Sequence, residues 1–141
     1  MAATKGRRSQ PCDRAEALNR LTQAESFVEV AELVAAAEGD SVATPNVAAA
    51  LAVLAGVAAS DAACCARLKE RPRGQDHRDA VTLLEGVHPR GGQMAKDLQR
   101  LLARKDDAQH GVLMGSRRDT GRMVEWAKRI TGLARTVLEA T

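Results

Sequence analysis

The sequence predicts an all-α fold, an up-and-down bundle of four to five antiparallel helices. Its 141 residues are rich in Ala, Val and Leu but include one Phe, one Trp and no Tyr. Strands are enriched in aromatic residues, so this composition favours close-packed helices. Successive segments also place apolar residues at i, i+3 and i+4 spacing, with short connections typical of antiparallel neighbours. We expect residues 13–141 to form a single helical-bundle domain.

The first helix is predicted from Asp13 to about Glu38, after a basic segment, 1–12, that is expected to be a disordered tail. Asp13 is a suitable N-cap residue, and Glu16 three positions later completes the pattern of a capping box. Gly39 is the expected stop. The predicted core positions of this helix are Ala17, Leu18, Leu21, Ala24, Phe27, Val28, Ala31 and Val34.

The second helix is predicted from Pro45 to about Lys69, with Thr44 as its N-cap. Its middle part, Val47 to Ala59, is apolar almost all round and should be the central, most buried element. Gly56 and the many alanines would let a neighbouring helix approach closely. This apolar stretch is too short to span a bilayer, so no membrane segment is expected.

Three further helices follow the break at Pro72-Arg73-Gly74. Each is expected from an amphipathic pattern between glycine-rich or polar connections. Gly86 is the expected stop of the first of them, and Gly111 of the second. They are predicted from Asp76 to about Glu85, from near Gln93 to Gly111, and from Asp119 or Thr120 to near the C-terminus.

Charge and cysteine content limit the function classes. The net charge of +3 permits contact with RNA or a nucleotide, while the scarcity of aromatic residues argues against binding by base stacking. The cysteines, Cys12, Cys64 and Cys65, are odd in number and two are adjacent, which does not indicate a disulfide framework. We expect reduced, buried thiols in a cytoplasmic protein. No spacing of Cys or His indicates a metal site, and no cofactor is expected.

The polar end of the fourth helix carries the first candidate site. Arg104 has a planar guanidinium suited to phosphate oxygens, and His110 can exchange a proton near neutral pH. Six positions apart, their side chains would point about 120° apart on a regular helix. They could share a ligand only if the helix unwinds near His110 or a second subunit completes the site. The alternative is an ordinary helix C-terminus, with an ion pair between Arg104 and Asp107.

A second candidate lies at the start of the third helix. Arg73 in an exposed loop, followed by Asp76 and His77, could bind an anion with side chains and backbone N–H groups. The alternative is that Asp76 only caps the helix and the arginines of this loop are solvated.

Three segments give the chain a resemblance to the HEPN superfamily, small helical bundles found beside nucleotidyltransferases and in toxin–antitoxin systems. The likeness covers roughly Asp13 to Leu138. It is carried by the order of the helices and by Ser60-Asp61-Ala62-Ala63-Cys64-Cys65, Gly74-Gln75-Asp76-His77-Arg78-Asp79-Ala80 and the stretch from Lys105 to Gly111.

The resemblance implies a homodimer, and many such proteins are metal-independent ribonucleases whose motif is an Arg followed a few residues later by a His. Here five residues stand between Arg104 and His110. In such a site Arg104 would stabilise the transferring phosphate and His110 would act as acid or base. A second alignment, on the Ala-His-Tyr or Ala-Asp-Tyr pattern of related sequences, places Gln109 at the His position and implies a catalytically silent protein.

Three hypotheses therefore remain. The first is a HEPN-like homodimeric interaction or nucleotide-binding module, with a nucleotidyltransferase as partner and with Arg73, Asp76, His77 and Gln109 as ligand-binding residues. The second is a toxin-like endoribonuclease that uses Arg104 and His110 on RNA. The third is a helical protein with a purely structural role.

Overall fold

The fold is known from a computed structural model, which describes residues 9–37, 43–74, 76–109 and 117–141. For residues 43, 44 and 106–109 it describes only the backbone.

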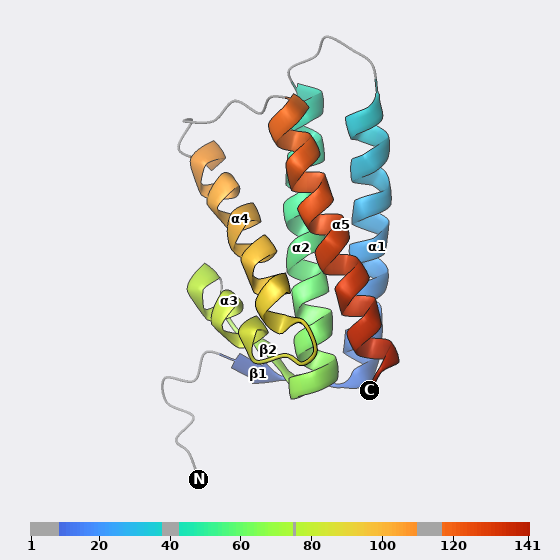
Figure 1. Cartoon of the computed structure of the whole chain (residues 1–141), viewed down its shortest axis with the longest axis vertical. Coiled ribbons are helices and arrows are strands. Elements are labelled where there is room, and N and C mark those ends of the chain that lie inside the picture. The colour runs from blue at the N-terminus through green and yellow to red at the C-terminus, as the bar shows by residue number, and fades with distance from the viewer. Residues whose placement is uncertain (1–8, 38–42, 75, 110–116) are drawn as a thin grey trace.

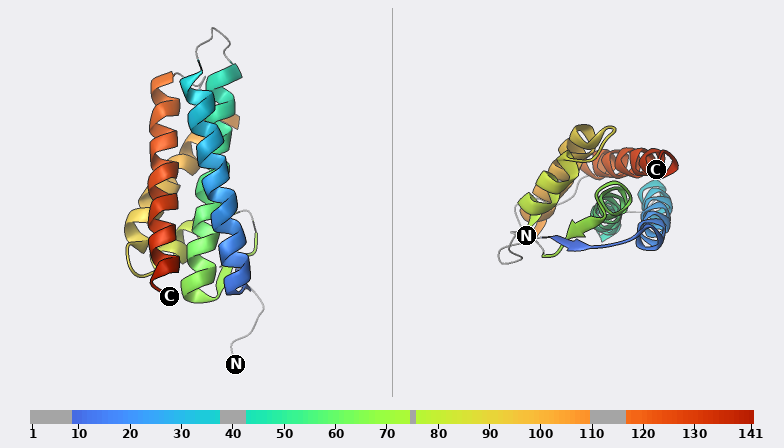
Figure 2. Two further views of the ribbon diagram at one scale, coloured as in Figure 1. Left: turned by 90° about the vertical axis from the view of Figure 1, so that its right-hand side faces the viewer. Right: turned by 90° about the horizontal axis from the view of Figure 1, so that it is seen from below.

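The described chain is an all-α bundle, as predicted. Four long helices alternate in direction, and a short helix, α3, lies beside the start of α4 (Figure 1). Seen end-on, α2 lies between α1 and α5 on one side and the α3–α4 pair on the other (Figure 2). The helices are α1 (Arg14–Ala36), α2 (Ala43–Leu68), α3 (His77–Glu85), α4 (Gly91–Gln109) and α5 (Arg117–Glu139).

Two three-residue strands, which the sequence did not predict, pair at the lower end of the bundle (Figure 1). β1 (Ser9–Pro11) runs antiparallel to β2 (Glu70–Pro72), with Gln10 opposite Arg71. The expectation of a disordered tail over 1–12 is therefore wrong for residues 9–12, and residues 1–8 lie outside the described part. Pairing with a segment about sixty residues away leaves no local pattern, because neither strand alternates apolar and polar residues over a useful length.

The helix ends follow the predicted signals in part. The Asp13 carboxylate accepts the Glu16 N–H at 2.9 Å, which confirms the N-cap of α1. Thr44 is not an N-cap, because α2 already begins at Ala43. The α4 and α5 helices each begin about two residues before the predicted start. The predicted stops at Gly39 and Gly111 lie outside the described residues.

The core is built on α2, and Gly56 explains how tightly its neighbour packs. A Cβ at Gly56 would lie 2.6 Å from Cδ1 of the fully buried Leu101, so α4 approaches there only because the side chain is absent. The burial of α2 is not uniform, however, since Val47 and Leu54 are about half exposed. Leu18 of α1, a predicted core residue, is also 46% exposed.

By length and composition α2 is long and apolar enough to cross a membrane over Pro45–Leu68, a longer stretch than the Val47–Ala59 run considered in the sequence. Within the bundle, 67% of that apolar window is buried, which is also how the core helix of a soluble protein behaves.

Candidate functional site

A cavity of about 290 Å³ opens between α2, α4 and the segment that joins β2 to α3. Its lining is mixed, with the buried Ser60 and Asp61 and the more exposed Arg73 and Lys105 among the polar side chains. The apolar side chains that line it are Val57, Pro72, Ala80, Leu98 and Leu102.

Cationic side chains line the more exposed part of this cavity, which we call its mouth. Arg73 follows β2 directly and is exposed, whereas Lys105 on α4 is half-buried. Neither of these two has a hydrogen bond or ion pair within the described part of the chain. His77, the first residue of α3, also lines the cavity and has partners of its own. Two cations that have no counter-ion among the described residues, beside one concave surface, make an attractive position for an anion.

Buried polar groups of α2 form the inner wall. Ser60 is 2% exposed, and its hydroxyl makes no hydrogen bond of ordinary geometry to the described residues. The Cys64 thiol, one turn further on, interacts with this hydroxyl but is a weak partner. A buried hydroxyl without a good partner costs about 1–3 kcal/mol. Such a group beside a cavity is suited to bind a polar ligand atom.

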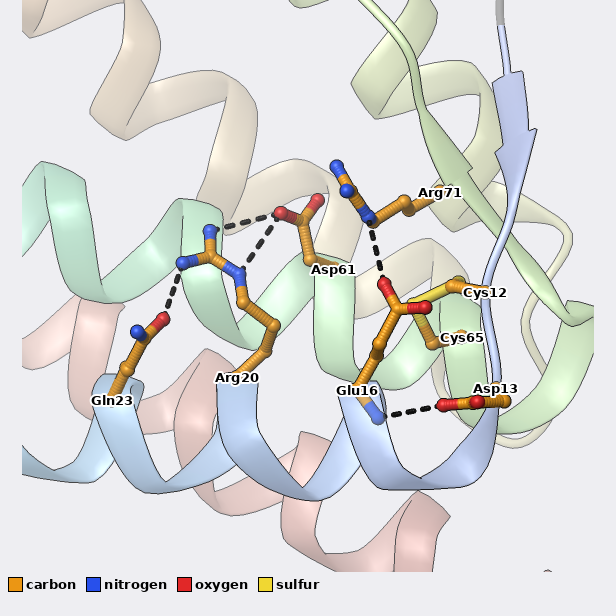
Figure 3. A network of polar contacts seen from close by, with 8 residues as sticks. All are labelled: Cys12, Asp13, Glu16, Arg20, Gln23, Asp61, Cys65 and Arg71. Atoms are coloured by element: carbon orange, nitrogen blue, oxygen red, sulfur yellow. Dashed lines mark hydrogen bonds and ion pairs between the residues drawn. A yellow bond between two sulfur atoms is a disulfide. The ribbon is translucent and has the colours of Figure 1, made fainter.

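The neighbouring Asp61 is buried and held by an arginine from α1. One oxygen, Oδ2, accepts hydrogen bonds from Nε and Nη2 of Arg20, at 3.2 and 2.9 Å. Burial raises the pKa of Asp61 above its ordinary value of 3.8, although the nearby Arg20 and Arg71 charges oppose this shift. Figure 3 shows the carboxylate between Arg20 and Arg71. Its second oxygen accepts no hydrogen bond among the described residues and is available to a ligand donor.

Arg71 is held in place from two further sides. Its Nε lies 3.6 Å from the Glu16 carboxylate of α1 (Figure 3). The Gln10 amide of β1 is oriented so that both its oxygen and its nitrogen find suitable partners. In this orientation the oxygen accepts hydrogen bonds from both terminal nitrogens of Arg71, at 2.9 and 3.2 Å. Glu16 was expected to complete the capping box of α1. Its side chain instead helps to position Arg71 in the cavity wall.

A second, more open hollow of about 410 Å³ adjoins the first. It is lined by residues of α1 together with Asp61 and Arg71, which line both hollows. These two side chains therefore lie where the two hollows meet.

The structure brings together three of the predicted ligand-binding residues, Arg73, Asp76 and His77. Asp76 also caps α3, accepting the Arg78 N–H at 2.9 Å, so its predicted role as an N-cap is confirmed. The fourth predicted ligand-binding residue, Gln109, is the last residue of α4, and the structure describes only its backbone.

The predicted catalytic pair stays a prediction, because His110 lies outside the described residues. Arg104 does not line the cavity, and its Nη2 lies 3.7 Å from the Asp119 carboxylate of α5. The predicted ion pair between Arg104 and Asp107 involves a side chain that is not described.

Sequence reasoning missed Ser60, Asp61 and Lys105 as cavity residues. The available signal was the Ser-Asp pair itself, two polar residues inside a helix that is otherwise apolar from Val47 to Ala66. Inside such a helix, polar side chains must find partners or line a cavity.

The expectation of three reduced cysteines is wrong. Cys12 and Cys65 form a disulfide with their Cα atoms 5.4 Å apart, while Cys64 is a free, buried thiol. The sequence did not indicate this disulfide, because Cys12 comes to lie beside α2 only through the position of β1. Burial, helped by the nearby Asp61 charge, raises the pKa of Cys64 to about 12, so this thiol is unreactive near neutral pH.

Among the described residues, no group of three or more His, Cys, Asp or Glu side chains is arranged to hold a metal ion. Comparison of the chain with protein-family models, curated proteins and solved structures found no match. The fold and the cavity are therefore the basis for a functional assignment.

Proposed function

We propose that the protein is a binding module for a small phosphorylated ligand of mononucleotide size, held in the cavity between α2, α4 and the β2–α3 segment. One observation carries the proposal. Two cations without partners in the described chain, Arg73 and Lys105, flank a cavity whose inner wall carries the buried, poorly satisfied hydroxyl of Ser60.

The charge distribution favours a phosphate at the mouth. An arginine fork and a lysine ammonium are common partners of phosphate oxygens. His77 beside them can donate a further hydrogen bond. The Asp61 carboxylate would repel a phosphate placed at the inner wall, so the anionic group belongs at the mouth.

The remaining wall favours an uncharged body with a hydrogen-bond donor. Leucine and valine side chains of α2 and α4 form part of the lining, and the second Asp61 oxygen is an acceptor. Pockets for small molecules usually measure about 300–1,000 Å³, so a cavity of about 290 Å³ suits a nucleoside monophosphate rather than a dinucleotide.

Isothermal titration with AMP, GMP, adenosine and inorganic phosphate tests this proposal. We expect a nucleoside monophosphate to bind more tightly than adenosine or phosphate alone, because only it engages both the mouth and the inner wall. Absence of binding by all four compounds at millimolar concentration would overturn the proposal.

The endoribonuclease hypothesis needs Arg104 and His110 to act together. In this alternative Arg104 would have to exchange its ion pair with Asp119 for a phosphate. Its test is RNA cleavage in EDTA by the wild type, Arg104→Ala and His110→Ala. Cleavage that both substitutions abolish would favour this alternative over the binding module.

A homodimer, a nucleotidyltransferase partner and a cytoplasmic location remain proposals that rest on the resemblance and the composition. Light scattering of the purified chain tests the dimer. Co-purification from cells tests the partner.

A further inference from the structure

We propose that the Cys12–Cys65 disulfide is a redox switch on the cavity wall. Its reduction would release β1, loosen β2 and thereby weaken ligand binding. The part of this inference that concerns affinity rests on the proposed function, whereas the release of the strand does not.

The strand β1 has few attachments of its own. It consists of three residues, of which Pro11 has no N–H to donate to the ladder. Three residue pairs join it to β2, and an isolated two-stranded ribbon of this size is not stable in water. The disulfide directly after it, from Cys12 to Cys65 of α2, is the cross-link that holds the end of β1 beside α2, in addition to the peptide connection to α1.

The contacts of β1 fall on the residues that build the cavity wall. Gln10 accepts hydrogen bonds from the Arg71 guanidinium, and the Ser9 hydroxyl donates to the Glu70 carboxylate. Arg71 and Pro72 of β2 line the cavity directly, and Arg73 follows them. Loss of β1 would therefore leave this part of the wall without its neighbouring strand.

The turn between α2 and β2 depends on the same attachment. Lys69 has a φ of +62°, a left-handed conformation that is unfavourable for a residue with a side chain. Its carbonyl accepts the Cys12 N–H at 3.0 Å. Release of Cys12 removes this hydrogen bond, so the strained turn that aims β2 at the cavity loses one of its supports.

The chemistry is a two-electron thiol–disulfide exchange with a dithiol reductant. A reductant thiolate attacks the Cys12 sulfur, which belongs to the less buried partner (8% against 0% exposed). The Cys65 sulfur leaves as a thiolate and takes up a proton. The second reductant thiol then displaces Cys12 as a thiol, and the reductant is released as a cyclic disulfide. Cys64 does not compete, because its raised pKa keeps it protonated.

The test compares the oxidised and reduced full chain by titration with AMP and by hydrogen exchange of the β2 amides. We expect reduction with dithiothreitol to lower AMP affinity about tenfold. This corresponds to a reduced chain in which about one molecule in ten keeps the cavity wall in its binding-competent arrangement. Exchange of residues 9–12 and 69–73 should rise while that of α5 stays unchanged. Cys12→Ser should bind like the reduced chain in both conditions, and the matched control Cys64→Ala should keep the redox response.

Equal AMP affinity and equal exchange in both redox states would overturn the proposal. If AMP binds in neither state but exchange at β2 rises on reduction, the ligand assignment fails and the release of the strand is supported. If exchange rises throughout the helices as well, reduction unfolds the bundle and the local switch is contradicted.

Discussion

The Arg20 guanidinium on α1 donates two hydrogen bonds to one oxygen of Asp61 on α2, a residue that lines two adjoining hollows. The Asp61 side chain is 13% exposed, so removing its partner leaves a buried charge without a direct hydrogen bond. We expect Arg20→Ala to lower the free energy of unfolding by about 2 kcal/mol. Urea denaturation measures this change. In an Asp61→Asn background the same substitution should cost much less, and equal costs in both backgrounds would contradict the coupling.

The raised pKa of Asp61 predicts a specific pH dependence of stability. Because the folded-state pKa lies above 3.8, the folded chain binds more protons than the unfolded chain between that value and the raised pKa. The contribution of Asp61 to stability therefore decreases as the pH rises through this window. The stability of Asp61→Asn relative to the wild type should increase over the same window. Parallel stability curves of the two proteins from pH 3.5 to 7 would contradict this assignment.

The Asp97 carboxylate joins α4 to α5 and is 1% exposed. Arg129 donates hydrogen bonds of 2.7 and 2.9 Å to it, and Arg100 donates one of 3.0 Å. Arg129→Ala should destabilise the fold by about 3 kcal/mol, because the buried carboxylate keeps only one partner. Asp97→Asn should cost less, about 1–2 kcal/mol, since both arginines are about half exposed and can be solvated. Denaturation that ranks the two variants in the opposite order would contradict this account.

Two helix glycines should respond oppositely to replacement by alanine. In α5, a Cβ at Gly132 meets no atom within 4 Å, so Gly132→Ala should stabilise by up to about 1 kcal/mol through helix propensity. In α2, Gly56→Ala places its Cβ against the buried Leu101, and the cost of overpacking, about 1–3 kcal/mol, should exceed the propensity gain. Melting temperatures that change in the same direction for both variants would contradict the close packing at Gly56.

The helices could be predicted from the sequence because each carries a continuous apolar pattern and because Asp13 and Asp76 are strong caps. The strand pair and the disulfide could not, since each joins residues more than fifty positions apart and leaves no periodic signal. Tertiary contact also overrides local signals, as Glu16 shows by pairing with Arg71.

Half of the candidate site was predictable in the same sense. Arg73, Asp76 and His77 are neighbours in sequence, so one loop brings them together without knowledge of the fold. Lys105 and the Ser60-Asp61 pair join them only through the packing of α4 against α2. A lysine on an amphipathic helix is typical of a solvated face. Lys105 and Lys96 both lie on α4, and they differ in that Lys105 lines the cavity.

The central claim, that the cavity binds a phosphorylated ligand through its mouth, is tested most directly by AMP titration of two charge-matched pairs. Lys105→Ala and Arg73→Ala should each weaken binding about tenfold, since a charge-assisted hydrogen bond contributes about 1.5 kcal/mol. Lys96→Ala on the same helix and Arg118→Ala on α5 remove equal charge from exposed positions outside the cavity and should leave the affinity unchanged. Equal affinities for all four variants would contradict the claim.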